Sequence, residues 1–199
     1  MTKKPASKNG KFPSTVYVSE TGSFDEKMIN SLITEDLRAV VLILDFGKLH
    51  SAASLTNETV KAVSAFPVPV ITAITGDVTE NWIPLVEASH LCIASDASRF
   101  TISNDRIDAI EACKIGLINQ SVSDENVESA ANELAGRISE LAPLAIRAFI
   151  TAVDLGMQTE ISEGLKIELE LFQSLFETND MREGTAAFFE KRKAVFSGI

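Results

Sequence analysis

A continuous apolar run at residues 39–44, Ala-Val-Val-Leu-Ile-Leu, constrains the fold of this chain more than any other feature. The run lacks the polar alternation of a half-exposed strand, and the turn-forming residues Asp45 and Gly47 follow it. A short run of this kind is typical of a strand covered on both faces, as in a parallel sheet. Two similar runs follow, Val68–Ile74 and Leu91–Ala94, so we expect three buried strands.

The segments between these runs have helical patterns. Leu55–Phe66 and Pro84–His90 are the candidate helices, and each lies between two of the predicted strands. Strand and helix alternating over residues 39–94 favour parallel βαβ winding over hairpins. The sequence therefore predicts an α/β fold.

The chain becomes helical after Ser121. Ser123-Asp124 is a candidate start for a first helix, and Pro143 suits the first turn of a second that ends near Gly156. Thr159 is a candidate start for a third helix. Asp180 and Glu183 resemble a capping box at the start of the last one. We therefore divide the chain into a flexible basic tail (1–14), a shortened α/β core (15–121) and a C-terminal helical region (122–199).

Composition limits the partners of the chain. Its formal net charge of −10 disfavours nucleic acid and anionic membrane surfaces, which would repel it. No apolar run is long enough to cross a membrane, and the polar, basic start does not resemble a signal peptide. Cys92 and Cys113 lack metal-site spacing, and only His50 and His90 could join them, so we expect no metal and two reduced thiols in a cytoplasmic protein.

Five segments in order resemble the crotonase (enoyl-CoA hydratase/isomerase) superfamily. The most distinctive is the ending, Glu183-Gly-Thr-Ala-Ala-Phe-Phe-Glu-Lys-Arg-Lys-Ala-Val-Phe-Ser-Gly198, which is similar to the family's EG-x-x-AF-x-EKR-x-P-x-F-x-G. The other four are Leu37–Leu42, Pro69–Gly76, Glu111–Asn119 and Ala142–Ala145. The resemblance implies a shortened crotonase-like ββα spiral core with a C-terminal α-helical region.

The resemblance also implies an oxyanion hole, in which two backbone N–H groups polarise an acyl-thioester carbonyl. Ala53 of Ser51–Leu55 matches the first donor, although that stretch is one residue shorter than in the family. The second donor belongs to a glycine-rich turn that matches Thr75–Leu85 without a gap, and the three glycines correspond to Glu80-Asn81-Trp82. Asn81 is the candidate second donor. Trp82 is expected to fill the space that glycine leaves for the thioester.

Two family glutamates that act as acid and base match residues that cannot do so. The first falls on Pro84 and the second on Asn104 of Phe100–Asn104, and neither a proline nor an amide titrates. The chain is also shorter than the family between Asn104 and Glu111. Hydration of crotonyl-CoA at an enzymatic rate is therefore not expected.

Other polar residues have two interpretations each. His90, His50 and a carboxylate pair of Asp77 with Glu80 could replace the lost groups, but a structural histidine and a solvated acidic loop explain them as well. Lys191 and Arg192 resemble the basic family ending that lies near CoA, although a helix C-terminus attracts cations anyway.

Three functions stay open. The chain could bind an acyl thioester of CoA or of a carrier protein with weak or altered activity. It could be an inactive scaffold or partner subunit of another enzyme, or an ordinary hydratase. No cofactor other than an acyl-CoA ligand is implied. The resemblance of the C-terminal region, together with its aromatic residues, predicts a homotrimer.

Overall fold

The computed structural model describes residues 2–3, 12–18, 24–34, 36–48 and 55–199. They form two compact units, Met1–Gly136 and Arg137–Ile199. This division falls inside helix α5 (Val127–Ser139), whereas the sequence placed the change of architecture at residues 121 and 122.

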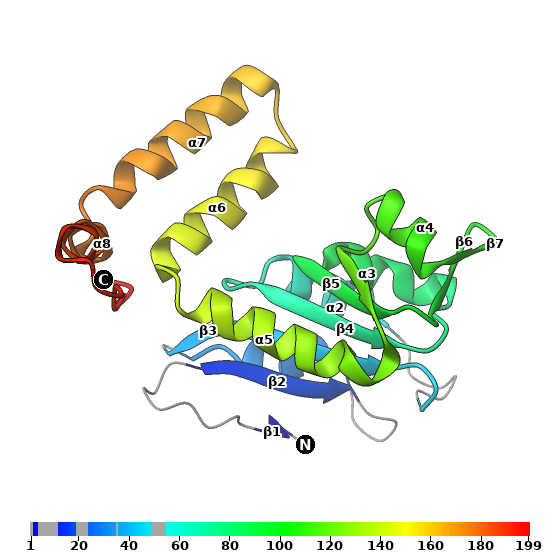
Figure 1. The fold of residues 1–199 in the computed structure, drawn as a ribbon. Coiled ribbons are helices and arrows are strands. Elements are labelled where there is room, and N and C mark those ends of the chain that lie inside the picture. The colour runs from blue at the N-terminus through cyan, green and yellow to red at the C-terminus, as the bar shows by residue number, and fades with distance from the viewer. Residues whose placement is uncertain (1, 4–11, 19–23, 35, 49–54) are drawn as a thin grey trace. The chain divides into compact units, whose positions relative to one another are not determined.

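The first unit is built on a sheet whose strand order, in the described residues, is β1-β2-β3-β4-β5-β8 (Figure 1). All neighbouring pairs from β2 to β8 are parallel, and only β1 runs antiparallel to β2. The predicted parallel βαβ winding is therefore confirmed. The strands are β1 (Thr2–Lys3), β2 (Phe12–Val18), β3 (Leu37–Asp45), β4 (Val70–Thr75), β5 (Leu91–Ser95) and β8 (Gln120–Val122).

Strand β3 is the apolar run that led to the α/β prediction. Its residues 37–42 and 44 are all buried, because helices cover both faces of the sheet. Asp45 pairs with Thr75, so β3 and β4 end together at one edge. That edge positions the candidate site described below.

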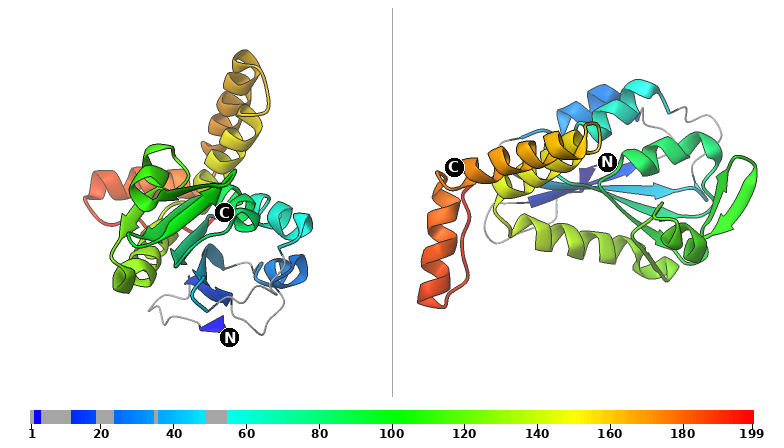
Figure 2. Two further views of the ribbon diagram at one scale, coloured as in Figure 1. Left: turned by 90° about the vertical axis from the view of Figure 1, so that its right-hand side faces the viewer. Right: turned by 90° about the horizontal axis from the view of Figure 1, so that it is seen from above.

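Helices lie on the two faces of the sheet (Figures 1 and 2). On one face are α1 (Glu26–Ser31), α2 (Asn57–Ser64) and α3 (Ile83–Ala88), and on the other is α5. A one-turn 3-10 helix, η1 (Glu80–Trp82), runs directly into α3, and η2 (Asp124–Asn126) precedes α5. The predicted helices at 55–66 and 84–90 thus exist, with boundaries shifted by one or two residues.

A small hairpin and a short helix follow β5. The hairpin consists of β6 (Arg99–Ile102) and β7 (Asp105–Asp108), and α4 (Ala109–Lys114) begins directly after it. The segment that resembles the family's second glutamate region, Phe100–Asn104, is therefore not extended along its whole length. The strand ends at Ile102, and Ser103 and Asn104 form the turn with φ of 50° and 71°.

The second unit contains α6 (Pro143–Gly156), α7 (Ile161–Leu175) and α8 (Asn179–Glu190). Pro143 occupies the first turn of α6, as predicted. Thr159 does not start α7, because the N-cap of that helix is Glu160. The Thr159 hydroxyl instead donates a hydrogen bond to the Leu155 carbonyl of α6.

The capping box predicted at Asp180 and Glu183 is also wrong. Thr178 caps α8 and accepts a hydrogen bond from the Met181 N–H. Asp180 and Glu183 are therefore free to bind the C-terminal segment instead.

The predicted basic tail does not end at residue 14. β2 begins at Phe12, and Thr2–Lys3 pairs with Thr15 and Val16 of that strand. Among the residues that the structure describes, no helix is long and apolar enough to cross a membrane.

Candidate functional site

The candidate site lies where β3 and β4 end, at the carboxyl edge of the parallel strands. Ligands of open α/β sheets bind outside this edge. The Phe46 N–H donates to the Thr75 carbonyl at 2.8 Å, so the turns that follow the two strands lie side by side. The geometry of these two turns decides what can approach the edge.

Gly76 allows this close approach. Its φ is +83°, and a Cβ placed on it would lie 2.9 Å from the Gly47 nitrogen and 3.2 Å from the Phe46 Cβ. A side chain there would collide with the neighbouring backbone and would also be strained at positive φ. On the other turn, an Asp45 carboxylate oxygen accepts from the Gly47 N–H at 3.1 Å, and Lys48 pairs with that carboxylate.

Trp82 fills the space beside these turns. Its side chain is buried in η1, with 7% of its surface exposed. The indole stacks on Phe24, with the ring centroids 6.4 Å apart, and meets Phe46 edge-to-face at 5.4 Å. Trp82 and Phe24 belong to the hydrophobic core of the first unit and the half-buried Phe46 packs against it, so Trp82 packs inward.

The two aromatic partners of Trp82 were not identified from the sequence. Phe46 had a usable signal, because it directly follows a buried strand, where side chains reach the carboxyl edge. Phe24 lies outside every predicted element, so nothing in its neighbourhood distinguished it.

Of the two candidate oxyanion donors, one lies within the described residues and the other does not. Ala53 and His50 lie in residues 49–54, outside the described residues. Asn81 lies in η1, next to the buried Trp82, and its side chain is exposed. Both stay candidates.

Pro84 and Asn104, which the sequence resemblance places at the family's glutamate positions, lie on exposed parts of the first unit. Pro84 is in the first turn of α3, where the lack of an N–H costs nothing. Asn104 is the second residue of the β6–β7 turn. Asn104 has the left-handed conformation of a turn residue, whereas its neighbour Asp105 begins β7.

Asp77 and Glu80 do not form a carboxylate pair. Asp77 is paired with Arg106 of β7, and both side chains are 60% exposed. Together with the backbone bonds of Val78 to Arg99 and Thr101, this ion pair fixes the hairpin against the turn that follows β4. Glu80 is exposed, as expected of a solvated acidic loop.

His90 has a structural role. Its Nδ1 accepts a hydrogen bond from the Val70 N–H at 3.1 Å, which ties the start of β5 to the start of β4. The lone pair of Nδ1 is engaged in this bond, so the structural interpretation is favoured over a general base.

The cysteines are free, as predicted. Burial, with a smaller contribution from the neighbouring Cys113, raises the pKa of the Cys92 thiol to about 12. Cys92 is therefore a neutral core residue at physiological pH. Among the described ranges, no group of three or more His, Cys, Asp or Glu side chains could hold a metal ion.

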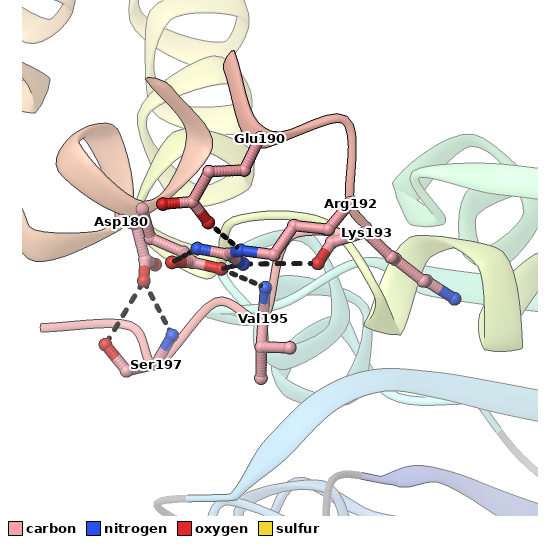
Figure 3. Close-up of polar contacts among 7 residues, drawn as sticks. Asp180, Glu190, Arg192, Lys193, Val195 and Ser197 are labelled. Atoms are coloured by element: carbon pink, nitrogen blue, oxygen red, sulfur yellow. Dashed lines mark hydrogen bonds and ion pairs between the residues drawn. The ribbon is translucent and has the colours of Figure 1, made fainter. Parts of the chain in front are cut away.

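Arg192, a candidate CoA ligand, is bound by two carboxylates. Its guanidinium forms a bidentate pair with Glu183 at 2.6 and 2.9 Å and also contacts Glu190 at 2.5 Å (Figure 3). Lys191 is exposed and ends α8 in the left-handed conformation. The carboxylates therefore compete with any phosphate for the Arg192 guanidinium, whose side chain is 40% exposed.

Comparison with known proteins extends these observations. The family model described as enoyl-CoA hydratase/isomerase matches residues 94–198. YngF of Bacillus subtilis is named as an enoyl-CoA hydratase/isomerase. It is 31% identical to this chain over 195 residues, which cover 82% of this chain and 75% of YngF. The crotonyl-CoA hydratase of Syntrophomonas wolfei is 41% identical over 100 residues, which cover 50% of this chain but only 38% of that enzyme.

Solved structures agree on the fold. An enoyl-CoA hydratase from Bacillus anthracis superposes with a TM-score of 0.80 at 20% identity, covering 100% of this chain and 99% of that one. The parallel sheet and the C-terminal helical region therefore define an α/β protein with a crotonase-like fold, as predicted. More specifically, the chain belongs to the enoyl-CoA hydratase/isomerase family.

Proposed function

We propose that this member of the family is not a hydratase and that it acts as a non-catalytic partner or scaffold subunit for another enzyme. The observation that carries the proposal is the buried indole of Trp82, locked between Phe24 and Phe46 at the carboxyl edge of β3 and β4. An indole buries on the order of 200 Å². It cannot share its space with the arm of a thioester ligand.

The residues at the matched glutamate positions support the same proposal. Pro84 and Asn104 cannot exchange a proton, and both are exposed rather than directed into a shared cavity with Trp82. Loss of one acid or base group costs about two to four orders of magnitude in rate. Loss of both leaves little catalysis.

The second candidate function is acyl-thioester binding with weak or altered activity, the ligand being an acyl group on CoA or on a carrier protein. The exposed position of Asn81, in the turn that resembles the family's second N–H donor, favours it. Binding would require Trp82 to swing out of the core, and this requirement separates the two candidates.

One titration distinguishes them. Trp82 is the only tryptophan of the chain, so its emission reports directly on this site. If Trp82 closes the site, butyryl-CoA leaves the emission unchanged, and calorimetry detects no binding tighter than about 100 μM, which corresponds to roughly 5–6 kcal/mol. Saturable binding with a shift in emission would establish the second candidate instead.

Crotonyl-CoA hydration tests the remaining alternative. We expect turnover below about 1 per second, the lower end of ordinary enzyme rates. A higher turnover would identify an ordinary hydratase and contradict both proposals.

We further propose that the chain assembles as a homotrimer through the second unit. The support is the number of exposed aromatic side chains there: Phe172 of α7 forms an edge-to-face pair with Phe176, which directly follows that helix, and Phe188 and Phe189 form another on α8. Exposed apolar surface of this extent is typical of protein interfaces. Light scattering should give about three times the 21.5 kDa of one chain, and a purely monomeric species at micromolar concentration would refute the trimer.

The proposed environment is the cytoplasm, since two free thiols fit a reducing compartment.

A further inference from the structure

The C-terminal residues 193–199 fold back along α8 and are held there by two carboxylates. Asp180 and Glu183 lie three residues apart, and side chains at this spacing lie on the same face of a helix. Glu183 accepts from the Val195 N–H at 2.7 Å. Asp180 accepts from the Ser197 N–H at 2.6 Å (Figure 3). It also accepts from the Gly198 N–H at 2.9 Å.

Further contacts lie along the same strip of α8. The Asn179 N–H donates to the Ile199 carbonyl at 2.8 Å, and the ring of Phe196 covers Gly184, where an added Cβ would lie 3.5 Å from the ring. The Asp180 carboxylate becomes buried as a result, and only 3% of the residue is exposed. The segment thus satisfies a carboxylate that would otherwise require water.

The reversal of the chain at the end of α8 is strained. Lys191 has φ of 55° and ψ of 38°, the left-handed region in which glycine is preferred. The N–H groups of Lys191 and Arg192 close the helix end on the carbonyls of Phe188 and Ala187. The Arg192 guanidinium, paired with Glu183, then fixes the direction in which the chain leaves.

The apolar support of these contacts comes chiefly from Phe196, which is half-buried. Val195 is 70% exposed and Ile199 is 72% exposed, so hydrogen bonds contribute most of the contacts that hold the segment on α8. Segments with few buried contacts open at a lower free energy than the helices that carry them.

We propose that residues 193–199 are a latch that opens from and closes on α8 as one unit. Lys191 is the hinge, and the carboxylates of Asp180 and Glu183 accept the hydrogen bonds of the latch backbone. While the latch is closed, Phe196 and the latch backbone occupy the strip of α8 around Gly184. Opening exposes that strip together with the two carboxylates. The latch does not depend on acyl-thioester binding and goes beyond the function proposed above.

Hydrogen exchange of single amides, measured by NMR on the full chain, tests the proposal. In the wild type we expect the Val195, Ser197 and Gly198 amides to exchange through one shared opening, faster than the Ala187 and Phe188 amides of α8. Glu183→Gln removes the negative charge that binds the Val195 N–H and the Arg192 guanidinium. It should accelerate all three latch amides by about the same factor, on the order of tenfold or more, and leave Ala187 and Phe188 unchanged.

Two further variants make the test specific. Glu170→Gln changes charge equally at an exposed position on α7, and we expect no effect on the latch amides. Lys191→Gly relieves the strain at the hinge without removing a latch contact, so it should slow exchange of the three amides by about fivefold.

Acceleration of Val195 alone in Glu183→Gln would show that the contacts are independent. Equal acceleration of Ala187 and Phe188 would show that the segment is merely part of α8. Either result overturns the latch.

Discussion

The indole of Trp82 lies edge-to-face against the ring of Phe46, with 5.4 Å between the ring centroids. One ring belongs to a one-turn helix after β4, and the other follows the last residue of β3. The contact therefore packs the segments that follow the two strands against each other at their carboxyl edge. If Trp82 closes the site as proposed, the stability of the fold and the closure of the site are coupled through this one side chain.

Trp82→Ala tests this coupling. Removing a buried indole leaves a cavity, so we expect the free energy of unfolding to fall by about 3–5 kcal/mol in urea denaturation. Ile110→Ala is a suitable control, because Ile110 is 62% exposed and its loss should cost less than about 1 kcal/mol. Equal losses in the two variants would show that Trp82 does not anchor the core.

Gly76→Ala tests the close approach of the two turns. The added Cβ would collide with the Gly47 nitrogen and impose φ of +83° on an alanine, so we expect a loss of about 1–3 kcal/mol or more. Gly136→Ala is the matched control, since nothing lies within 4 Å of its added Cβ inside α5. It should stabilise the chain by up to about 1 kcal/mol. A neutral Gly76→Ala would contradict the described turn.

Asn104 is predicted to matter for its backbone conformation and not for chemistry. Asn104→Gly keeps a residue that accepts φ of 71° and should change stability by less than about 0.5 kcal/mol, whereas Asn104→Val should destabilise by about 1–2 kcal/mol. Asn104→Glu should not produce crotonyl-CoA hydration. Measurable hydration by Asn104→Glu would mean that the turn faces a working site.

Cys92 is predicted to make the chain sensitive to alkali. Its folded-state pKa, raised to about 12, lies above the unfolded value of about 8.5–9, so the folded chain holds a proton that the unfolded chain releases. This contribution to stability is complete below about pH 9 and declines as the pH rises toward 12. The slope approaches about 1.4 kcal/mol per pH unit.

Unfolding curves measured between pH 8 and 11 check this prediction. Cys92→Ala should remove the alkaline slope, whatever its effect at pH 7. Cys113→Ala is the control, because Cys113 is only half-buried and should leave most of the slope in place. An unchanged slope in Cys92→Ala would assign the alkaline transition to another group.

The sequence by itself determined the parts of this protein that depend on local patterns. The buried run at 39–44, the parallel winding around it and the helical second half follow from apolar periodicity, and the ordered motifs of the C-terminal half indicated the family. Residues 183–198 were informative because their pattern is continuous along the chain.

Only the tertiary structure decided which of these residues meet. The sequence placed Trp82 beside a thioester site, but its contacts with Phe24 and Phe46 arise because parallel strands bring distant turns to one edge. Asp180 and Glu183 have the spacing of a capping box, yet Thr178 caps the helix and the two carboxylates receive residues 195–198. A local pattern specifies which bonds a side chain is able to form, and the long-range path of the chain determines the partner.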